Sequence, residues 1–200
     1  FHPLPPAPVG TPIRLVPCGI PAAPRKLEVM IDAVKATTTP VTLDLYLIKD
    51  GSEYYRSLVE RAGDDPRITF QDPVPYAQLV ETLNRYDIGL SVIAPSTFNL
   101  AWCLPNKFFD FIQARLGVIV GPSPEMVRFV DQYGVGAVAD DFGAAALTAV
   151  LDGLTPERVA AFKAASDRYA QDLSSEEQVK IWGDVVDGIL HSAPAAARPA

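Results

Sequence analysis

A lysine and an aspartate stand three residues apart at the predicted start of a helix, as Lys107 and Asp110. Pro105 suits the first helical position, because its missing N–H would be unpaired there, and an apolar helical series follows it. A lysine in the first turn opposes the helix dipole and costs roughly a few tenths of a kcal/mol unless an anion shares the site. We therefore expect this helix start to bind a phosphate through Lys107 and free N–H groups, with Asp110 accepting from a sugar hydroxyl. The alternative is a surface ion pair between Lys107 and Asp110.

Cations also open another predicted helix, shortly after the first predicted strand at 13–18. Gly19 allows the backbone to approach a ligand closely, and Arg25 and Lys26 begin the helix that follows. Helix starts after strands one and four lie at the same edge of a doubly wound sheet, beside the point where the strand order reverses. One shared anion would explain the unfavourable charges at both helix starts. The alternative is that Arg25 and Lys26 are simply solvated.

Short apolar and β-branched runs alternate with amphipathic segments along the whole chain. This rhythm predicts an α/β fold, a Rossmann-like doubly wound parallel sheet of about six strands with helices on both faces and a C-terminal helical extension. The predicted strands are 13–18, 42–48, 68–71, 87–92, 117–120 and 137–139. The predicted helices are 25–36, 52–62, 76–84, one from 105, one capped by Ser123, 142–151, and two closing helices that begin at Pro156 and after Ser174. A long loop precedes Pro105, and such loops are often functional.

The two ends of the chain differ from its middle in composition. Residues 1–12 are rich in proline and predict a linker from an upstream segment, so we expect the chain to be the C-terminal part of a longer protein. Residues 13–191 form the predicted domain, whose last helix has an apolar face that includes Trp182, which we expect to be packed. Residues 192–200 are mostly alanine and proline and are predicted to be disordered.

Composition excludes several classes of protein. Of the 200 residues, 48% are hydrophobic and 20% charged, enough to bury the core of one ordinary domain. The formal charge of −7 argues against nucleic acid as a partner, because that partner needs a dense basic surface. Two cysteines and two histidines predict neither a disulfide framework nor a metal site. No spanning apolar run and no signal segment are visible, so we expect a cytoplasmic location.

The phosphate-binding motifs of other nucleotide folds are missing from this sequence. No G-x-G-x-x-G follows the first strand, and no Walker lysine motif is present, which argues against a dinucleotide dehydrogenase and a P-loop enzyme. The first strand also ends without the acidic residues of a phosphoacceptor receiver domain.

A series of segments, taken in order, resembles the donor-binding C-terminal domain of GT-B glycosyltransferases, and among them most closely the retaining family four (glycosyl transferases group 1). The segments are Gly19, Arg-x-Leu-Glu-x-x-Ile-Asp-Ala (25–33), Gly51, Ile-x-Phe-x-x-x-Val (68–74), Tyr-Asp-Ile-Gly-Leu (86–90) and Leu-Pro-Asn-Lys-Phe-Phe-Asp (104–110). The resemblance covers 13–151 and continues into the closing helices, the last of which returns to the N-terminal half in this family.

The resemblance implies a role for individual residues in binding a nucleotide sugar. It places the nucleotide ribose on Asp110, the diphosphate on Lys107 and the amides of its helix start, and the base on the backbone around Val74. The donor sugar faces the loop 99–104. The implied donor-binding residues are Gly19, Arg25, Lys26, Val74, Asn99, Pro105, Asn106, Lys107 and Asp110.

The implied activity is transfer of a sugar from a UDP or GDP sugar to an acceptor, by metal-independent displacement and without a cofactor besides the donor substrate. Acceptor-side catalytic groups are expected on an N-terminal GT-B domain, the implied partner of this chain. Any peripheral membrane association would also belong to that half. We therefore expect the chain alone to bind a donor weakly and to transfer nothing.

Four positions depart from the family pattern. Trp102 stands where the family often has a carboxylate that touches the donor sugar, and Ile20 replaces an arginine. Arg115 and Gly117 replace a glycine and a proline of the turn after the ribose helix. One alternative is therefore a catalytically degenerate GT-B half that serves partner contact or assembly. Another is the corresponding half of a nucleotide-sugar epimerase, which would share the donor site, although no additional acid or base residues in this half favour it.

Overall fold

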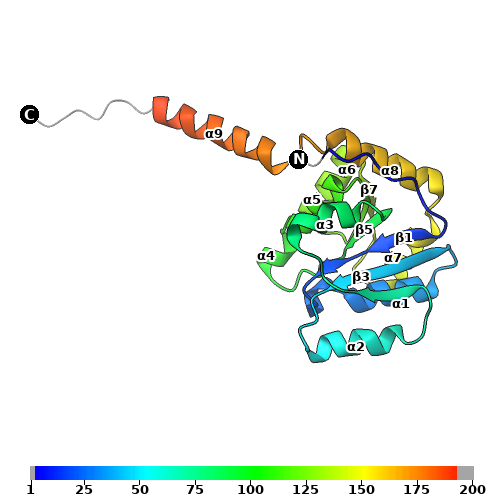
Figure 1. Ribbon diagram of the computed structural model, residues 1–200. Helices are drawn as coiled ribbons and strands as arrows, with labels where there is room; N and C mark the ends of the chain where they lie inside the picture. The colour runs from blue at the N-terminus through cyan, green and yellow to red at the C-terminus, as the bar shows by residue number, and fades with distance from the viewer. Residues whose placement is uncertain (1–2, 193–200) are drawn as a thin grey trace, which may run out of the picture.

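Seven parallel strands form one sheet within residues 3–192, the part of the chain that the computed structural model describes (Figure 1). The order is β4-β3-β1-β5-β6-β7, and β2 lies beside β3 beyond the end of β1. The strands are β1 (Ile13–Val16), β2 (Cys18–Gly19), β3 (Val41–Leu47), β4 (Ile68–Gln71), β5 (Ile88–Ser91), β6 (Gly117–Val120) and β7 (Gly136–Val138). The expected doubly wound parallel sheet is confirmed, with one strand more than expected because Pro17 divides the first one.

Helices cover both faces of the sheet (Figure 1). They are the 3-10 turn η1 (Ala23–Arg25), α1 (Leu27–Ala36), α2 (Glu53–Ala62), α3 (Tyr76–Leu83), α4 (Phe98–Ala101), α5 (Asn106–Gln113), α6 (Pro124–Tyr133), α7 (Ala144–Asp152), α8 (Pro156–Tyr169) and α9 (Ser175–Ser192). Residues of α1, α2 and α7 pack in one hydrophobic cluster, and residues of α3, α5 and α6 pack in a second. The sheet is therefore the middle layer between two hydrophobic cores.

The strand order reverses at β1, which lies between β3 and β5. Leu15 and Val16 of β1 pair with Ile88 and Gly89 of β5. After Pro17, the chain continues as β2 and pairs with β3, where Cys18 lies opposite Tyr46. The polypeptide thus turns away from β5 at the carboxyl end of the sheet, and a crevice forms at the position where ligands bind in doubly wound folds.

A glycine in β5 allows helix α5 to pack closely against the strand. A methyl group on Gly89 would overlap the ring of Phe111, so the helix approaches the strand more closely than a side chain would permit. Phe108, Phe111 and Ile112 are fully buried, and each side chain of this size contributes about 1.5–3 kcal/mol through burial. This packing fixes the first turn of α5 at the crevice.

A buried charge cluster joins the opposite, amino end of the sheet to α8. Asp87 directly precedes β5 and is fully buried, with Arg14 Nε 2.9 Å from its Oδ2 and Lys163 Nζ 3.5 Å from its Oδ1. Lys163 also donates to the backbone carbonyl of Tyr86 at 2.5 Å. These contacts satisfy a buried carboxylate at the far end of the sheet from the crevice, so their role is structural.

Two helix starts differ from the prediction. Arg25 ends the turn η1 and Lys26 is the N-cap of α1, with a φ of 48°, so neither lies inside the helix. Pro105 is the N-cap of α5 rather than its first helical residue. Ser123 is the N-cap residue of α6, as expected, but its hydroxyl makes no capping hydrogen bond and lies 3.5 Å from the carbonyl of Ile93.

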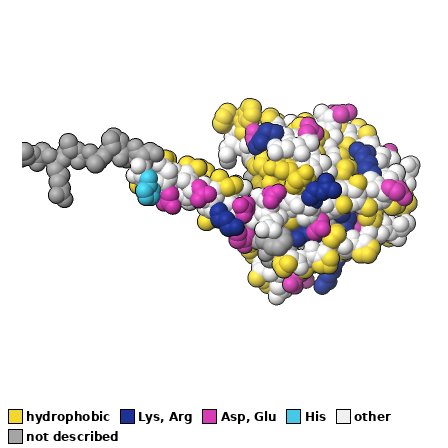
Figure 2. Space-filling model, turned by 90° about the horizontal axis from the view of Figure 1, so that it is seen from above, with side chains coloured by type: hydrophobic (Ala, Val, Ile, Leu, Met, Phe, Trp, Pro, Cys, Tyr) yellow, Lys and Arg dark blue, Asp and Glu magenta, His cyan; other side chains and the backbone are white. Residues whose placement is uncertain are grey.

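Helix α9 extends away from the body of the molecule (Figure 1), and Figure 2 shows hydrophobic side chains along it. Trp182 is 68% exposed, so the expectation that it is packed is wrong for this chain by itself. Val179, Val186, Ile189 and Leu190 are also exposed. Of the predicted linker, the amide of Gly10 donates to Asp87 and the carbonyl of Pro5 accepts from Asn84. Residues 1–2 and 193–200, which include nearly all of the predicted disordered tail, lie outside the described residues.

Candidate functional site

Two cavities open at the carboxyl end of the sheet, on either side of Lys107. The first has a volume of about 230 Å³ and lies between the ends of β1 and β5 and the start of α5, lined by Cys18, Arg25, Ile93, Pro105, Asn106 and Lys107 among others. The second has a volume of about 330 Å³ and is lined by Gly19, Tyr46, Ile48, Pro73, Val74, Tyr76, Leu79, Asn106, Lys107 and Asp110 among others. The fold therefore brings together most of the residues that the sequence proposes for a site.

Lys107 and Arg25 converge on the backbone of Gly19. The Lys107 ammonium donates a hydrogen bond to the carbonyl of Cys18. A methyl group on Gly19 would overlap the Lys107 amine and lie 3.3 Å from Nη1 of Arg25. Neither cation takes part in an ion pair within residues 3–192, so the alternative pairing of Lys107 with Asp110 is not formed.

The environment of Lys107 disfavours its charge. Burial lowers the pKa of Lys107 to about 8, and the positive charge of Arg25 acts in the same direction, while Asp110 opposes both. Lys107 also lies in the first turn of α5, where the helix dipole is positive. An anion bound here would offset the burial of the Lys107 charge, the repulsion from Arg25 and the unfavourable helix dipole together. This property is expected of a phosphate site.

Asp110 lies one turn further along α5 and is only 8% exposed. The hydroxyl of Tyr76, the first residue of α3, donates to its Oδ1 at 3.2 Å. Sequence reasoning missed Tyr76 as a site residue. Its position two residues after Val74 was the available signal, because the segment around Val74 was already assigned to the ligand.

Lys26 and Asn99 line neither cavity. Lys26 Nζ lies 3.8 Å from Oε1 of Glu28, so its charge has a neighbouring carboxylate on α1. Asn99 belongs to α4, a single turn within the long loop that the sequence did not predict.

The α4 turn presents aromatic side chains to solvent. Phe98 is 83% exposed and Trp102 is 51% exposed, and their ring centroids lie 6.4 Å apart. Ile20, the residue after Gly19, is 52% exposed. Two of the departures from the resembled pattern, Trp102 and Ile20, are therefore surface side chains at this edge of the sheet.

The two cysteines lie near the first cavity. Burial raises the pKa of the Cys18 thiol to about 11, and it also raises the pKa of Cys103. Both thiols are therefore protonated at neutral pH, which makes them poor nucleophiles. Within residues 3–192, no three His, Cys, Asp or Glu side chains group as metal ligands would, and no helix has the length and apolar character needed to cross a membrane.

No protein-family model and no curated protein matches this amino-acid sequence. Solved structures of glycosyltransferases share the fold. HepE of Anabaena, crystallised with UDP and glucose, is 13% identical with a TM-score of 0.70, and the match covers 90% of this chain and 48% of that one. Sucrose-phosphate synthase of Thermosynechococcus elongatus is 12% identical with a TM-score of 0.72, over 90% of this chain and 46% of that one.

A third match is to a domain rather than a whole enzyme. The C-terminal domain of LpcC, a glycosyl transferase group 1 family protein of Francisella tularensis, is 15% identical with a TM-score of 0.64, over 84% of this chain and 89% of that domain. The chain thus spans about half the length of the first two proteins and most of an isolated C-terminal domain. At these identities, the likeness establishes the fold, that of a Rossmann-like GT-B domain.

Proposed function

We propose that this chain is the nucleotide-sugar-binding half of a glycosyltransferase, which transfers a sugar from a nucleoside diphosphate sugar to an acceptor. The observation that carries the proposal is the convergence of Arg25 and Lys107 on Gly19, next to a cavity that Asp110 also lines. Two cations at one backbone position suit a diphosphate, and a carboxylate beside them suits a sugar hydroxyl. The likeness to glycosyltransferases, one of them crystallised with UDP and glucose, supports the same assignment.

The arrangement suggests how a donor would lie. The diphosphate would accept hydrogen bonds from Lys107, Arg25 and the free amides at the start of α5, in the first cavity. The ribose would donate to Asp110, and the base would occupy the second cavity beside Val74. The donor sugar would then point toward the α4 turn, where Asn99 lies.

The whole protein would also contain an acceptor-binding N-terminal domain. The exposed apolar face of α9 supports this expectation, because such a face is stable only when another surface covers it. Membership of retaining family four, displacement at the anomeric carbon without a metal, and a cytoplasmic location stay predictions. They require the complete protein to be tested.

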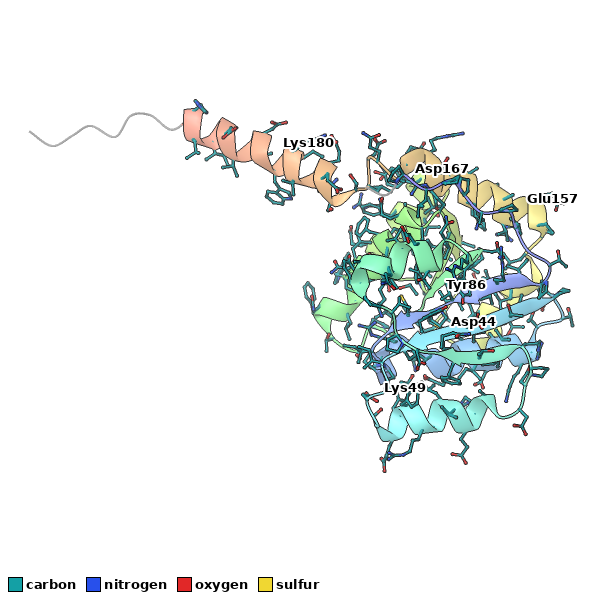
Figure 3. All side chains as sticks on the ribbon, in the orientation of Figure 1. Asp44, Lys49, Tyr86, Glu157, Asp167 and Lys180 are labelled. Carbon is teal, nitrogen blue, oxygen red and sulfur yellow. The ribbon has the colours of Figure 1, made fainter. Side chains whose placement is uncertain are left out.

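Calorimetric titration of the chain with UDP, GDP and their sugars tests the proposal. We expect weak binding of at least one of them. We also expect Lys107→Ala and Arg25→Ala each to weaken it by roughly 10- to 100-fold, since each removes a charged hydrogen bond. Lys180→Ala is the matched control, because Lys180 lies on α9, away from the sheet (Figure 3). Product formation by the chain alone would contradict its assignment as half of an enzyme.

A degenerate GT-B half, retained for contact with a partner, is the second candidate. Trp102 and Ile20 favour it, because both are apolar and exposed, and they stand where the resembled family often has a carboxylate and has an arginine, respectively. The same titration separates the two candidates. A degenerate half binds none of the nucleotides, whereas the donor-binding half binds at least one.

A further inference from the structure

Tyr76 occupies an unusual position at the edge of the proposed donor site. Its side chain is 74% exposed, yet its hydroxyl reaches the nearly buried carboxylate of Asp110. The negative charge of Asp110 raises the pKa of Tyr76, so the phenol stays protonated and remains a donor. Tyr76 begins α3 directly after Pro75, so its backbone belongs to the segment that also contains Val74.

The contact between Tyr76 and Asp110 lies at the boundary of two cavities. One is the 330 Å³ cavity next to Gly19 and Lys107. The other has a volume of about 340 Å³ and lies between α3, α5 and the start of α9, where Phe109, Gln113 and Ser174 are among its lining residues. Tyr76, Asn106 and Asp110 line both. Tyr76 therefore lies where the two cavities adjoin.

We propose that Tyr76 is a gate for the nucleoside. The Tyr76 hydroxyl contacts Asp110 until a ribose hydroxyl replaces it, and the Tyr76 ring then stacks on the base. This inference rests on the proposed function, because it requires a nucleotide on Asp110. It assigns a positioning role to a residue that is neither a phosphate ligand nor a ribose ligand.

The geometry favours this exchange. An oxygen-to-oxygen separation of 3.2 Å is long for such a hydrogen bond, whose usual length is about 2.7–2.8 Å, so little is lost when it breaks. A side chain that is 74% exposed has room to turn. The lining side chains next to it in the Gly19 cavity, Pro73 and Leu79, are apolar, so a ring that turns toward them can cover the face of a bound base.

Two substitutions at this position are expected to change nucleotide affinity in opposite directions. Tyr76→Phe keeps the ring and removes the competing hydroxyl, so UDP or GDP should bind about two- to tenfold more tightly. Tyr76→Ala removes the ring as well, and the lost stacking should weaken binding by about five- to 100-fold. If the role of Tyr76 were purely structural, both substitutions would weaken nucleotide binding. Tyr133→Phe on α6, where the ring packs on Phe129 and Tyr169, is the matched control.

The experiment is calorimetric titration of the chain and these variants with UDP and GDP, with thermal unfolding to establish that each variant is folded. The gain from Tyr76→Phe should disappear when Asp110 is replaced by Ala, because the hydroxyl then has no carboxylate to occupy. If the unsubstituted chain binds and Tyr76→Phe does not tighten binding, the gate is refuted while the proposed function stands. If the unsubstituted chain binds no nucleotide, both are refuted.

Discussion

Nε of Arg115 lies 2.7 Å from Oδ1 of Asp167, a contact that joins the end of α5 to α8. Arg115 is fully buried and has a φ of 62°, a left-handed conformation that favours glycine. Its guanidinium also donates to the carbonyl of Gln113 at 2.5 Å. Arg115, which stands where the resembled pattern has a turn glycine, is therefore held by contacts within the fold, and it lines neither of the two cavities at Lys107.

Asp167→Ala should lower the free energy of unfolding by about 1–3 kcal/mol, because it removes an acceptor from a buried guanidinium. The loss should be smaller than for a fully buried pair, since the Asp167 side chain is 47% exposed. Urea denaturation measures it. Asp131→Ala, at an exposed position on α6, is the control and should change stability by less than about 0.5 kcal/mol. Equal stability of the two variants would contradict a stabilising role for the Arg115 contact.

Gly19→Ala should abolish most nucleotide binding with only a modest loss of stability. Gly19 has a φ of 117°, and the new methyl group would overlap the Lys107 amine. Gly51→Ala is the matched control, because Gly51 also has a positive φ, of 70°, but nothing lies within 4 Å of the added methyl group. Backbone strain should cost Gly51→Ala roughly 1–2 kcal/mol of stability and Gly19→Ala, whose φ lies outside the left-handed helical region, roughly 1–3 kcal/mol, as thermal unfolding would measure. Only Gly19→Ala should weaken UDP or GDP binding, by roughly tenfold or more; a similar loss in both would exclude a specific effect at Lys107.

Nucleotide binding should weaken as the pH rises through about 8, the pKa of Lys107. Above this pH, the amine is neutral and no longer attracts the diphosphate, so affinity should fall by up to about tenfold per pH unit. Titrations between pH 6.5 and 9.5, values chosen to lie on either side of about 8, measure this. Lys107→Arg should give a flatter profile because the guanidinium keeps its charge. A profile of the unsubstituted chain that stays flat would contradict the role of Lys107.

The same lysine should make stability rise with pH when no nucleotide is added. The folded chain releases the Lys107 proton near pH 8, whereas the unfolded chain holds it to about 10.5, its ordinary value. Between these values the unfolded state binds more protons, so the free energy of unfolding increases with pH. The contribution of Lys107 is the difference between the unsubstituted chain and Lys107→Met in urea denaturation at several pH values. This difference should be most unfavourable below pH 8, where burial of the charge opposes folding in full, and should become less unfavourable as the pH rises from about 8 to 10.5.

Trp182→Gln on α9 should leave the melting temperature within about 2 °C of that of the unsubstituted chain, because the Trp182 side chain is 68% exposed and contributes little to the core. It should also reduce self-association, as analytical ultracentrifugation would measure, since an exposed apolar face favours contact between copies. Val159→Gln on α8 is the contrasting variant, because Val159 is fully buried and its replacement should destabilise the domain strongly. A large loss of stability in Trp182→Gln would show that α9 packs on the domain.

Hydrophobic patterns and turn residues predict much of this fold from the sequence. The strands Ile68–Gln71 and Gly117–Val120 lie where predicted. Gly, Asp and Pro mark their ends, and apolar residues alternate with polar ones in the first and predominate in the second. The division of the first strand into β1 and β2 was not predicted, and neither was helix α4. Strand β2 is two residues long and exists through its pairing with β3, and helix α4 is a single turn capped by Thr97. An element of two to four residues is too short to give a recognisable pattern in the sequence, and one that exists through pairing with a distant strand gives no local signal.

The candidate site was predictable in its charges but not in its contacts. Lys107 stood out because a cation at a helix start is unfavourable without a ligand, and Asp110 because it follows Lys107 by one helical turn. The contact of Lys107 with the Cys18 carbonyl joins residues 89 positions apart, which no local pattern reveals. Tyr76 was overlooked for a related reason, since an exposed aromatic residue at a helix start gives no sign that its hydroxyl reaches a carboxylate 34 positions away.

The break at Pro17 bears on how quickly a ligand can be captured. β1 pairs with β5, and after Pro17 the chain continues as β2, which pairs with β3. The separation between the ends of β2 and β5 is therefore set by the backbone hydrogen bonds of the folded chain. No strand has to part from its neighbour when a nucleotide arrives, so the free energy of opening the crevice is already included in folding. We therefore expect association to be governed by diffusion, by the attraction of Arg25 and Lys107, and by the rotation of one side chain, with no slow rearrangement of the sheet.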